Sequence, residues 1–190
     1  MEKKIGLFWL RDDFRTVKND GLIEATRNHD QVVVFYLYKQ DTYKDQEAQK
    51  WWLSKSLISF RKKLNNYNIS LQVVETNSFK IFFDKLTKKN NFAIYWNKVY
   101  EPDYLKFDEY LFSNLKKKSI NFKRFKGNTL NEIDEIKKND GTPFKVFTPF
   151  WRAAEKYYIE KVPSKEKIIK KCIKKKNYFK NCIEPEKILP

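Results

Sequence analysis

Residues 5–15 of the chain are Ile-Gly-Leu-Phe-Trp-Leu-Arg-Asp-Asp-Phe-Arg. The first six positions are apolar apart from one glycine, and four of the next five are charged. A short apolar run with such an abrupt end predicts a strand that is buried on both faces. The charged residues follow the carboxyl end of this strand, where open parallel sheets bind their ligands. We therefore predict a central first strand whose exit loop faces a crevice.

Four more strands are expected after this one, and helices alternate with them. β-branched and aromatic runs predict the strands, and apolar residues at helical spacing predict the helices. Asp20 is a candidate cap for the first helix, and Ser78 for the third. The strands are expected at 31–38, 70–75, 92–96 and 120–125, and the helices at 19–28, 45–67, 79–86 and 103–118. This alternation predicts a doubly wound α/β fold, Rossmann-like, with a five-stranded parallel sheet in the order 3-2-1-4-5.

The alternation stops near residue 126, which suggests a division into two parts. Residues 1–128 form the predicted α/β domain, and residues 129–190 form a connector. Thr148-Pro149 offers a helix start, since proline suits the first helical position, and we expect one helix near 149–161. A long segment without strands is unusual inside a compact domain. The connector is therefore expected to lead to a domain that the sequence does not contain.

The composition favours a folded, basic protein of a reducing compartment. Hydrophobic residues make up 41% of the 190 residues, which is enough for a core, and no apolar run has the length of a membrane span. The net charge is +16, and 34 of the 40 basic residues are lysine. An AT-rich genome explains much of this lysine excess, although a basic field also attracts nucleic-acid phosphates. Two cysteines without a CxxC motif fit a cytoplasmic location and no membrane association.

Several kinds of chemistry are excluded by residue counts. His29 is the only histidine, so neither a Ser-His-Asp triad nor a histidine metal site can form. Four scattered glycines make no phosphate-binding loop. Asp12 and Asp13 are adjacent in an extended segment and point opposite ways, so they do not share a proton. Trp51-Trp52 could be a stacking platform, but tryptophans on a helix are more often core residues. The residues therefore predict a ligand crevice, no catalytic set and no metal.

Three stretches together resemble one family, the DNA photolyases and cryptochromes. Residues 9–19 are similar to the family's opening W-F-R-x-D-L-R-x-x-D-N, with Lys18 in place of the aspartate. Residues 96–102, Trp-Asn-Lys-Val-Tyr-Glu-Pro, are similar to its W-N-x-x-Y-E-P. Residues 141–153, Gly-Thr-Pro-Phe-Lys-Val-Phe-Thr-Pro-Phe-Trp-Arg-Ala, resemble its G-x-P-Y-x-V-F-T-P-F-W-R-A almost residue for residue.

This resemblance implies the amino-terminal domain of a deoxyribodipyrimidine photolyase, which uses light and FAD to repair pyrimidine dimers in DNA. In the family a carboxyl-terminal helical domain holds the FAD and the lesion pocket, and that domain does not fit into these 190 residues. The implied partners are thus this helical domain and, for the full-length protein, DNA. We expect the 190-residue fragment to be inactive alone.

The resemblance also implies a pocket for a light-harvesting antenna chromophore, which is a folate, a deazaflavin or another flavin. Arg11, Asp13, Asn97 and Glu101 are the candidate contacts. The family's arginine before the long helix aligns with Gln49, its aspartate with Val99 and its folate-binding glutamate with Tyr104, so the chromophore's identity is not predicted. Two alternatives stand beside these roles. Arg11 and Arg15 would pair with Asp12, Asp13 or Glu101, and Asn97 and Glu101 would only tie the loop together.

The third motif has a structural interpretation. Phe147, Pro149, Phe150 and Trp151 surround the expected helix start and would pin the connector to a domain surface. Without the helical domain this apolar surface is exposed and favours self-association.

Two other functions are compatible with the same residues. A cryptochrome-type blue-light sensor would use the same domain for signalling. A stand-alone nucleotide- or chromophore-binding module would need no enzymatic partner.

Overall fold

One six-stranded sheet forms the centre of the protein. The computed structural model describes residues 5–127, 129, 131, 132, 135–159, 167–172 and 177–189. The strand order is β5-β4-β1-β2-β3-β6, and β1 lies between β2 and β4 with both neighbours parallel to it. The bounds are β1(Ile5–Leu10), β2(Val32–Tyr38), β3(Ser70–Glu75), β4(Phe92–Asn97), β5(Asn121–Phe125) and β6(Cys182–Ile183). The predicted α/β fold and the order of its five parallel strands are confirmed.

The prediction of five strands was wrong by one. β6 contributes only two residues and pairs antiparallel with β3, as Val73↔Ile183 and Val74↔Cys182. A two-residue strand has no alternation that a sequence pattern could reveal, and it forms because the chain returns to the free edge of β3. This pairing covers backbone groups of an edge strand that would otherwise be exposed.

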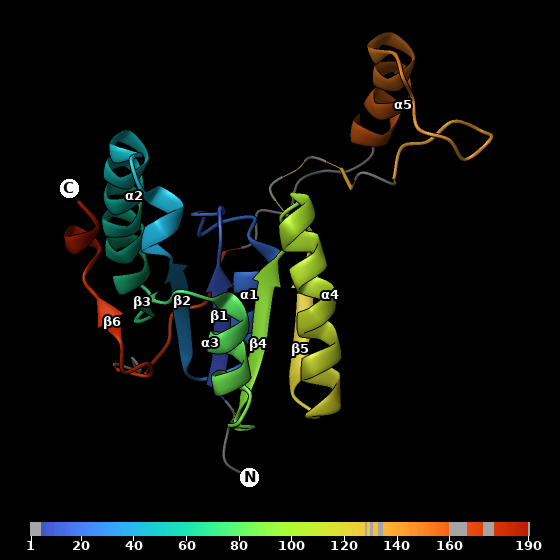
Figure 1. Cartoon of the computed structure of the whole chain (residues 1–190). Coiled ribbons are helices and arrows are strands. Elements are labelled where there is room, and N and C mark those ends of the chain that lie inside the picture. Colours follow the sequence, from blue (N-terminus) through green and yellow to red (C-terminus); the bar gives the residue numbers. More distant parts are fainter. Residues whose placement is uncertain are drawn as a thin grey trace.

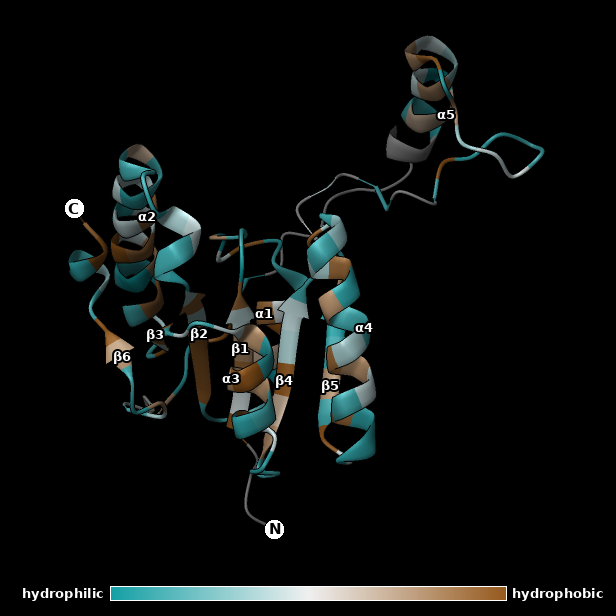
Figure 2. Ribbon diagram, in the orientation of Figure 1, coloured by the Kyte–Doolittle hydropathy of each residue, from teal (hydrophilic) through white to brown (hydrophobic). Residues whose placement is uncertain are grey.

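Four helices cover the two faces of the sheet, as Figure 1 shows. One apolar core lies between the sheet and α1(Asp20–Asn28) and α2(Glu47–Asn65), and contains Leu22, Leu57 and Phe60. A second core lies under α3(Phe79–Leu86) and α4(Pro102–Lys117), and contains Phe83 and Leu111. β2, in which all seven residues are buried, is brown in Figure 2, as expected for a strand that is covered on both faces.

The caps of two helices test the sequence analysis in detail. Ser78 caps α3 as predicted, because its side chain accepts a hydrogen bond from the backbone N–H of Ile81. For α1 the prediction was wrong by one residue, since Asn19 and not Asp20 accepts from the N–H of Leu22. Asp20 lies within the first turn instead. The side chain of Asn19 thereby comes to lie at the carboxyl edge of the sheet.

The carboxyl-terminal residues lie back against the sheet domain. Ile168 is buried in the core beside α1 and α2. The ammonium of Lys171 donates to the backbone carbonyls of Thr26 and His29, at the end of α1. The short helix η2(Pro185–Ile188) contacts α2, where the Ser54 hydroxyl donates to the carbonyl of Pro185 at 2.8 Å. The division at residue 128, which lies outside the described residues, stays a prediction.

Helix α5(Phe147–Ile159) projects away from the sheet in Figure 1. Residues 160 and 161 of the predicted helix lie outside the described residues. Phe147 and Trp151 stack with 6.2 Å between ring centroids and are 72% and 45% exposed. Phe150 and Pro149 are exposed as well. These four residues therefore do not pack on the α/β domain, and their docking against another domain stays a prediction.

Candidate functional site

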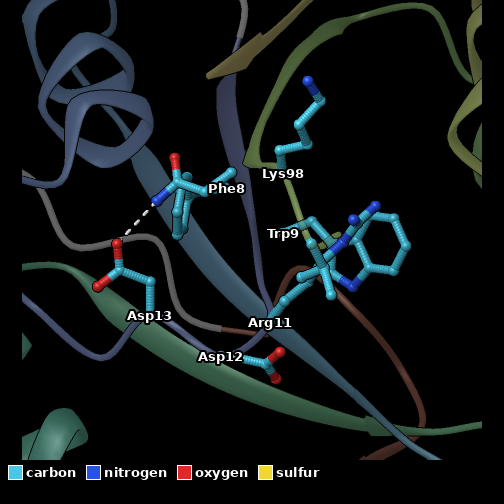
Figure 3. A pocket seen from close by; sticks show the side chains of 8 residues that line it. Phe8, Trp9, Arg11, Asp12, Asp13 and Lys98 are labelled. Carbon is cyan, nitrogen blue, oxygen red and sulfur yellow. Dashed lines mark hydrogen bonds between the residues drawn. The ribbon is translucent and has the colours of Figure 1, made fainter. Parts of the chain in front are cut away.

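The charged side chains of the loop after β1 lie in different environments. Asp13 is buried and accepts hydrogen bonds from Arg15 Nε at 2.7 Å and Nη2 at 2.8 Å. It also accepts from Asn97 Nδ2 at 3.0 Å, the dashed line in Figure 3. Asn97 Nδ2 donates in addition to Asn19 Oδ1 at 2.9 Å. These four residues, which we call the Asp13 network, join the ends of β1 and β4 to the start of α1.

The Asp13 network leaves little room for a ligand. The hollow beside it, lined by Asp13, Asn97 and Lys98 among others, has a volume of about 10 Å³, about enough for one water molecule. Gly21 lets α1 approach this network closely, because a Cβ at this position would lie 2.4 Å from Asn97 Oδ1. The carboxylate of Asp13 is therefore used by the protein itself.

Arg11 has a different environment. Its side chain is 4% exposed and forms an ion pair with Asp108 of α4, which also binds Arg124 at 3.0 Å. The guanidinium carbon lies 3.9 Å from the centroid of the Trp9 ring and 5.2 Å from that of Tyr104, and Figure 3 shows Arg11 beside Trp9. Stacking on aromatic faces is typical of arginine. The ion pair and the rings together fix the position of the guanidinium.

Two donors of this guanidinium are left over. Arg11 Nε and Nη1 are buried, and neither has a hydrogen-bond partner among the described residues. Burial lowers the pKa of Arg11, while Asp108 opposes this change by favouring the charged form. A buried donor without an acceptor is costly, by roughly 1–3 kcal/mol. Such a group calls for an acceptor from outside the described residues, which is either a water molecule or a ligand.

A cavity of about 470 Å³ adjoins Arg11 at the carboxyl edge of the sheet. We call it the ligand cavity. It lies between the loop after β1, the end of β2, the short helix η1(Gln40–Tyr43) and the first turns of α2. Its lining includes Arg11, Asp12, Tyr36, Tyr43, Gln49 and Trp52. Its volume lies in the range of small-molecule sites, which are mostly apolar with a few placed polar groups.

The titratable groups of the ligand cavity are mainly neutral hydroxyls. Burial raises the pKa of Tyr36 well above its usual value, and its hydroxyl lies 3.0 Å from that of Tyr43. Burial, together with the charge of Asp12, raises the pKa of nearby Tyr104 to about 12. Burial and the charge of Glu101 raise the pKa of Asp12. The cavity thus offers a fixed cation, one carboxylate and phenol donors.

The four candidate contacts are brought together only in part. Arg11, Asp13 and Asn97 line the small hollow together, and Arg11 also lines the ligand cavity. Glu101 is exposed, stands at the N-cap position of α4 and makes no side-chain cap bond. Of the two alternatives, the Arg15–Asp13 pair forms, and Arg11 pairs with Asp108 instead of a neighbour in sequence. Sequence reasoning missed Asp108 because no local pattern marks a partner 97 residues away.

The interpretation of Trp51 and Trp52 as core residues was wrong. They are 51% and 69% exposed. The buried stripe of α2 runs through Leu53, Leu57 and Phe60, while the first turn of the helix extends beyond the carboxyl edge of the sheet (Figure 1). There is no sheet under these two rings to bury them. Trp52 instead forms part of the wall of the ligand cavity.

The described ranges contain no group of three or more histidine, cysteine, aspartate or glutamate side chains suited to hold a metal ion. Their helices include none that combines the length and the apolar character needed to cross a bilayer.

The fold is a doubly wound α/β domain with a cavity at the carboxyl edge of its parallel strands, which is the edge where such folds bind their ligands. A sequence model of the DNA photolyase family matches residues 6–167. The chain therefore belongs to the DNA photolyase family.

Curated relatives are much longer than this chain. A deoxyribodipyrimidine photo-lyase of Agrobacterium fabrum is 28% identical over 149 residues, which are 78% of this chain and 31% of the relative. Cryptochrome-1 of Arabidopsis thaliana is 26% identical over 148 residues, which are 76% of this chain and 22% of the relative. The chain thus spans less than a third of either protein.

Solved structures of the family share the fold. A class III photolyase from Agrobacterium tumefaciens superposes with a TM-score of 0.82 at 24% identity, over 100% of this chain and 39% of that one. An archaeal photolyase from Sulfolobus tokodaii, solved with two FAD molecules, gives a TM-score of 0.71 at 21% identity, over 88% of this chain and 37% of that one.

Proposed function

We propose that this chain is the antenna domain of a light-driven DNA photolyase, and that its ligand cavity binds a light-harvesting chromophore. The observation that carries the proposal is Arg11. Its side chain lines a cavity of about 470 Å³, and its Nε and Nη1 are buried without a hydrogen-bond partner among the described residues. Such donors need an acceptor.

The cavity fits the antenna chromophores in shape and chemistry. Folates, deazaflavins and flavins are planar rings that carry carbonyl oxygens, and Arg11 Nε and Nη1 would donate to one of these oxygens. Tyr36 and Tyr43 add neutral hydroxyls, and the exposed face of Trp52 is suited to stack on a ring. The Sulfolobus tokodaii photolyase, which holds two FAD molecules, supports a second chromophore in addition to the catalytic one. The ring type stays open, because all three chromophores offer these features.

The other candidate residues receive supporting roles in this proposal. Asp13 and Asn97 position the loop after β1, since the Asp13 carboxylate and Asn97 Nδ2 are engaged in the Asp13 network, while Asn97 Oδ1 has no partner among the described residues. Glu101 acts on the ligand only through its charge, which raises the pKa of Asp12.

Catalysis is proposed to need residues beyond this sequence. FAD and the dimer would bind to a helical domain, which Phe147, Phe150 and Trp151 would dock, and the 190-residue chain alone would be inactive. The length of the relatives supports this, since the chain spans 31% of the Agrobacterium fabrum enzyme. The free thiols of Cys172 and Cys182 support a cytoplasmic location.

The cavity is tested by chromophore uptake. The purified chain is mixed with a folate, a deazaflavin or FMN and passed over a gel-filtration column, and co-eluting absorbance is measured. Ala48→Trp fills the mouth of the ligand cavity from an exposed position of α2, and we expect it to weaken uptake at least about tenfold. Lys62→Trp, at an exposed position of the same helix that does not line the ligand cavity, is the matched control. If no chromophore co-elutes with the native chain, the antenna role is wrong.

The division of labour is tested with DNA that contains pyrimidine dimers. Under blue light and reduced FAD, the chain alone is expected to leave the dimers intact. Repair by these 190 residues would contradict the proposal. Full-length protein that lacks repair activity but binds chromophores would favour the cryptochrome-type sensor, whose candidacy rests on the similarity to Cryptochrome-1.

A further inference from the structure

A second hollow continues the ligand cavity along helix α2. It has a volume of about 310 Å³, and it shares Phe14, Trp52 and Ser56 with the ligand cavity. We call it the α2 groove. Trp51, Lys55, Ser59 and Lys63 form one side of it at helical spacing, and Trp52, Ser56 and Phe60 form the other. The two hollows are therefore adjoining parts of one channel.

The chemistry of the α2 groove differs from that of the ligand cavity. Its ionisable lining consists of Lys55 and Lys63, and none of the described residues that line it is acidic. The ammonium of Lys55 lies 6.0 Å from the centroid of the Trp51 ring. At this distance the ring attracts the charge and keeps it beside the groove. Two serine hydroxyls provide further donors. This lining suits an anionic chain that leaves the ligand cavity past Trp52.

We propose that the α2 groove binds the anionic tail, a phosphate or a carboxylate, of the chromophore whose ring lies in the ligand cavity. This inference rests on the proposed function and narrows its ligand to chromophores that carry such a tail. The arrangement also gives a reason for the exposure of Trp51 and Trp52 at 51% and 69%, since both rings line the path of the tail.

The helix geometry determines how long a ligand tail must be to reach each of the two lysines. At a rise of about 1.5 Å per residue, Lys55 lies about 5 Å along the axis from Trp52, and Lys63 lies about 16 Å from it. A short tail with a phosphate would therefore reach Lys55 alone. A longer tail with several carboxylates would also reach Lys63.

The test compares ligands that differ only in the tail. Affinities of the 190-residue chain for FMN and riboflavin are measured by quenching of flavin fluorescence. Folic acid, its form with several glutamates and the bare pterin ring are compared in the same way. The variants are Lys55→Glu and Lys63→Glu. Lys62→Glu, which makes the same charge change on an exposed position outside the α2 groove, is the control. Thermal unfolding is measured for each variant to confirm that it folds.

The native chain is expected to bind FMN about tenfold more tightly than riboflavin, which is about 1.4 kcal/mol. Lys55→Glu should remove this preference and leave riboflavin affinity unchanged, and Lys62→Glu should change neither. Lys63→Glu should weaken only the folate with several glutamates. Loss of the preference in more concentrated salt would accompany this, because the lysines are exposed.

Two different results would overturn the inference. Equal affinities for tailed and tail-less ligands, or equal effects of Lys55→Glu and Lys62→Glu, would remove the tail site and leave the antenna role intact. Absence of binding for all five ligands would overturn the antenna role as well. A preference for folates over the pterin without a preference for FMN would assign the groove to carboxylates instead of phosphates.

Discussion

Arg11 and Asp13 are two residues apart in the loop after β1 and have different environments. The carboxylate oxygens of Asp13 accept hydrogen bonds from Arg15 and Asn97. Arg11 is paired with Asp108 and keeps two donors that have no partner among the described residues. A charged side chain that forms its hydrogen bonds within the protein stabilises the fold. A charged side chain whose N–H groups lack an acceptor within the protein can bind a ligand. The predictions below test this contrast.

The largest effect is expected for Asp108→Ala. Asp108 is fully buried and binds both Arg11 and Arg124, so its loss leaves the Arg11 charge buried without a counterion. We expect the free energy of unfolding to fall by about 4 kcal/mol, measured by urea denaturation. Glu109→Ala, at the exposed neighbouring position, is the control and should cost less than about 0.5 kcal/mol. A loss below about 1 kcal/mol for Asp108→Ala would mean that Arg11 is not held by this pair.

Asp13→Ala should cost less, at about 2–3 kcal/mol, because Arg15 is partly exposed and finds water instead. The affinity of the folded variant for chromophores should change less than about threefold, since Asp13 does not line the ligand cavity. Urea denaturation and fluorescence quenching check the two values. If Asp13→Ala has native stability but binds chromophores much more weakly, Asp13 contacts the ligand, and its role does not differ from that proposed for Arg11.

Trp52→Ala should separate binding from folding. The ring is 69% exposed, so the free energy of unfolding should change by less than about 0.5 kcal/mol. Chromophore affinity should fall about tenfold, because a stacking surface is lost from the wall of the ligand cavity. Trp51→Ala, on the adjacent residue that lines only the α2 groove, should have a smaller effect on tail-less ligands. Equal effects of the two variants on riboflavin would contradict a ring position at Trp52.

The smallest effect is expected for Asp12→Asn, and it depends on pH. Burial and the charge of Glu101 raise the pKa of Asp12 in the folded state, so the folded chain binds this proton more tightly than the unfolded chain. Asp12 therefore reduces stability at neutral pH, and the reduction vanishes as the pH falls through the raised pKa. Neighbouring groups desolvate part of the Asp12 side chain, but the residue is exposed overall, so we expect Asp12→Asn to stabilise by less than about 0.5 kcal/mol near neutral pH. Thermal unfolding of the native chain and the variant, measured between neutral and acidic pH, should show that their difference in stability shrinks as the pH falls. A difference that grows toward acidic pH would contradict the raised pKa of Asp12.

The sequence predicted the fold well because the fold rests on local patterns. The apolar runs of the parallel strands and the apolar stripes of α2 and α3 depend only on residues close in sequence, and these elements form within a few residues of the predicted ranges. The motifs around Trp9, Trp96 and Trp151 indicated the family, to which the match over residues 6–167 assigns the chain.

Which of the four candidate residues contact a ligand stays a prediction. Arg11 lines the ligand cavity, whereas Asp13, Asn97 and Glu101 are not among its lining residues. Charge and motif position do not show whether a side chain already forms its hydrogen bonds within the protein. The coordinates show that the Asp13 carboxylate accepts from Arg15 and Asn97, and that Arg11 Nε, Arg11 Nη1 and Asn97 Oδ1 have no partner among the described residues.

By itself, then, the sequence determined the strands, the helices, their order and the edge of the sheet at which a site would lie. The tertiary structure decided which residues of the Ile5–Arg15 stretch are available there. Asp108 reaches Arg11 across 97 residues, and β6 and η2 return to the domain from the far end of the chain. Long-range pairs of this kind form only when the packed elements bring their atoms within hydrogen-bond distance, and no local pattern encodes that distance.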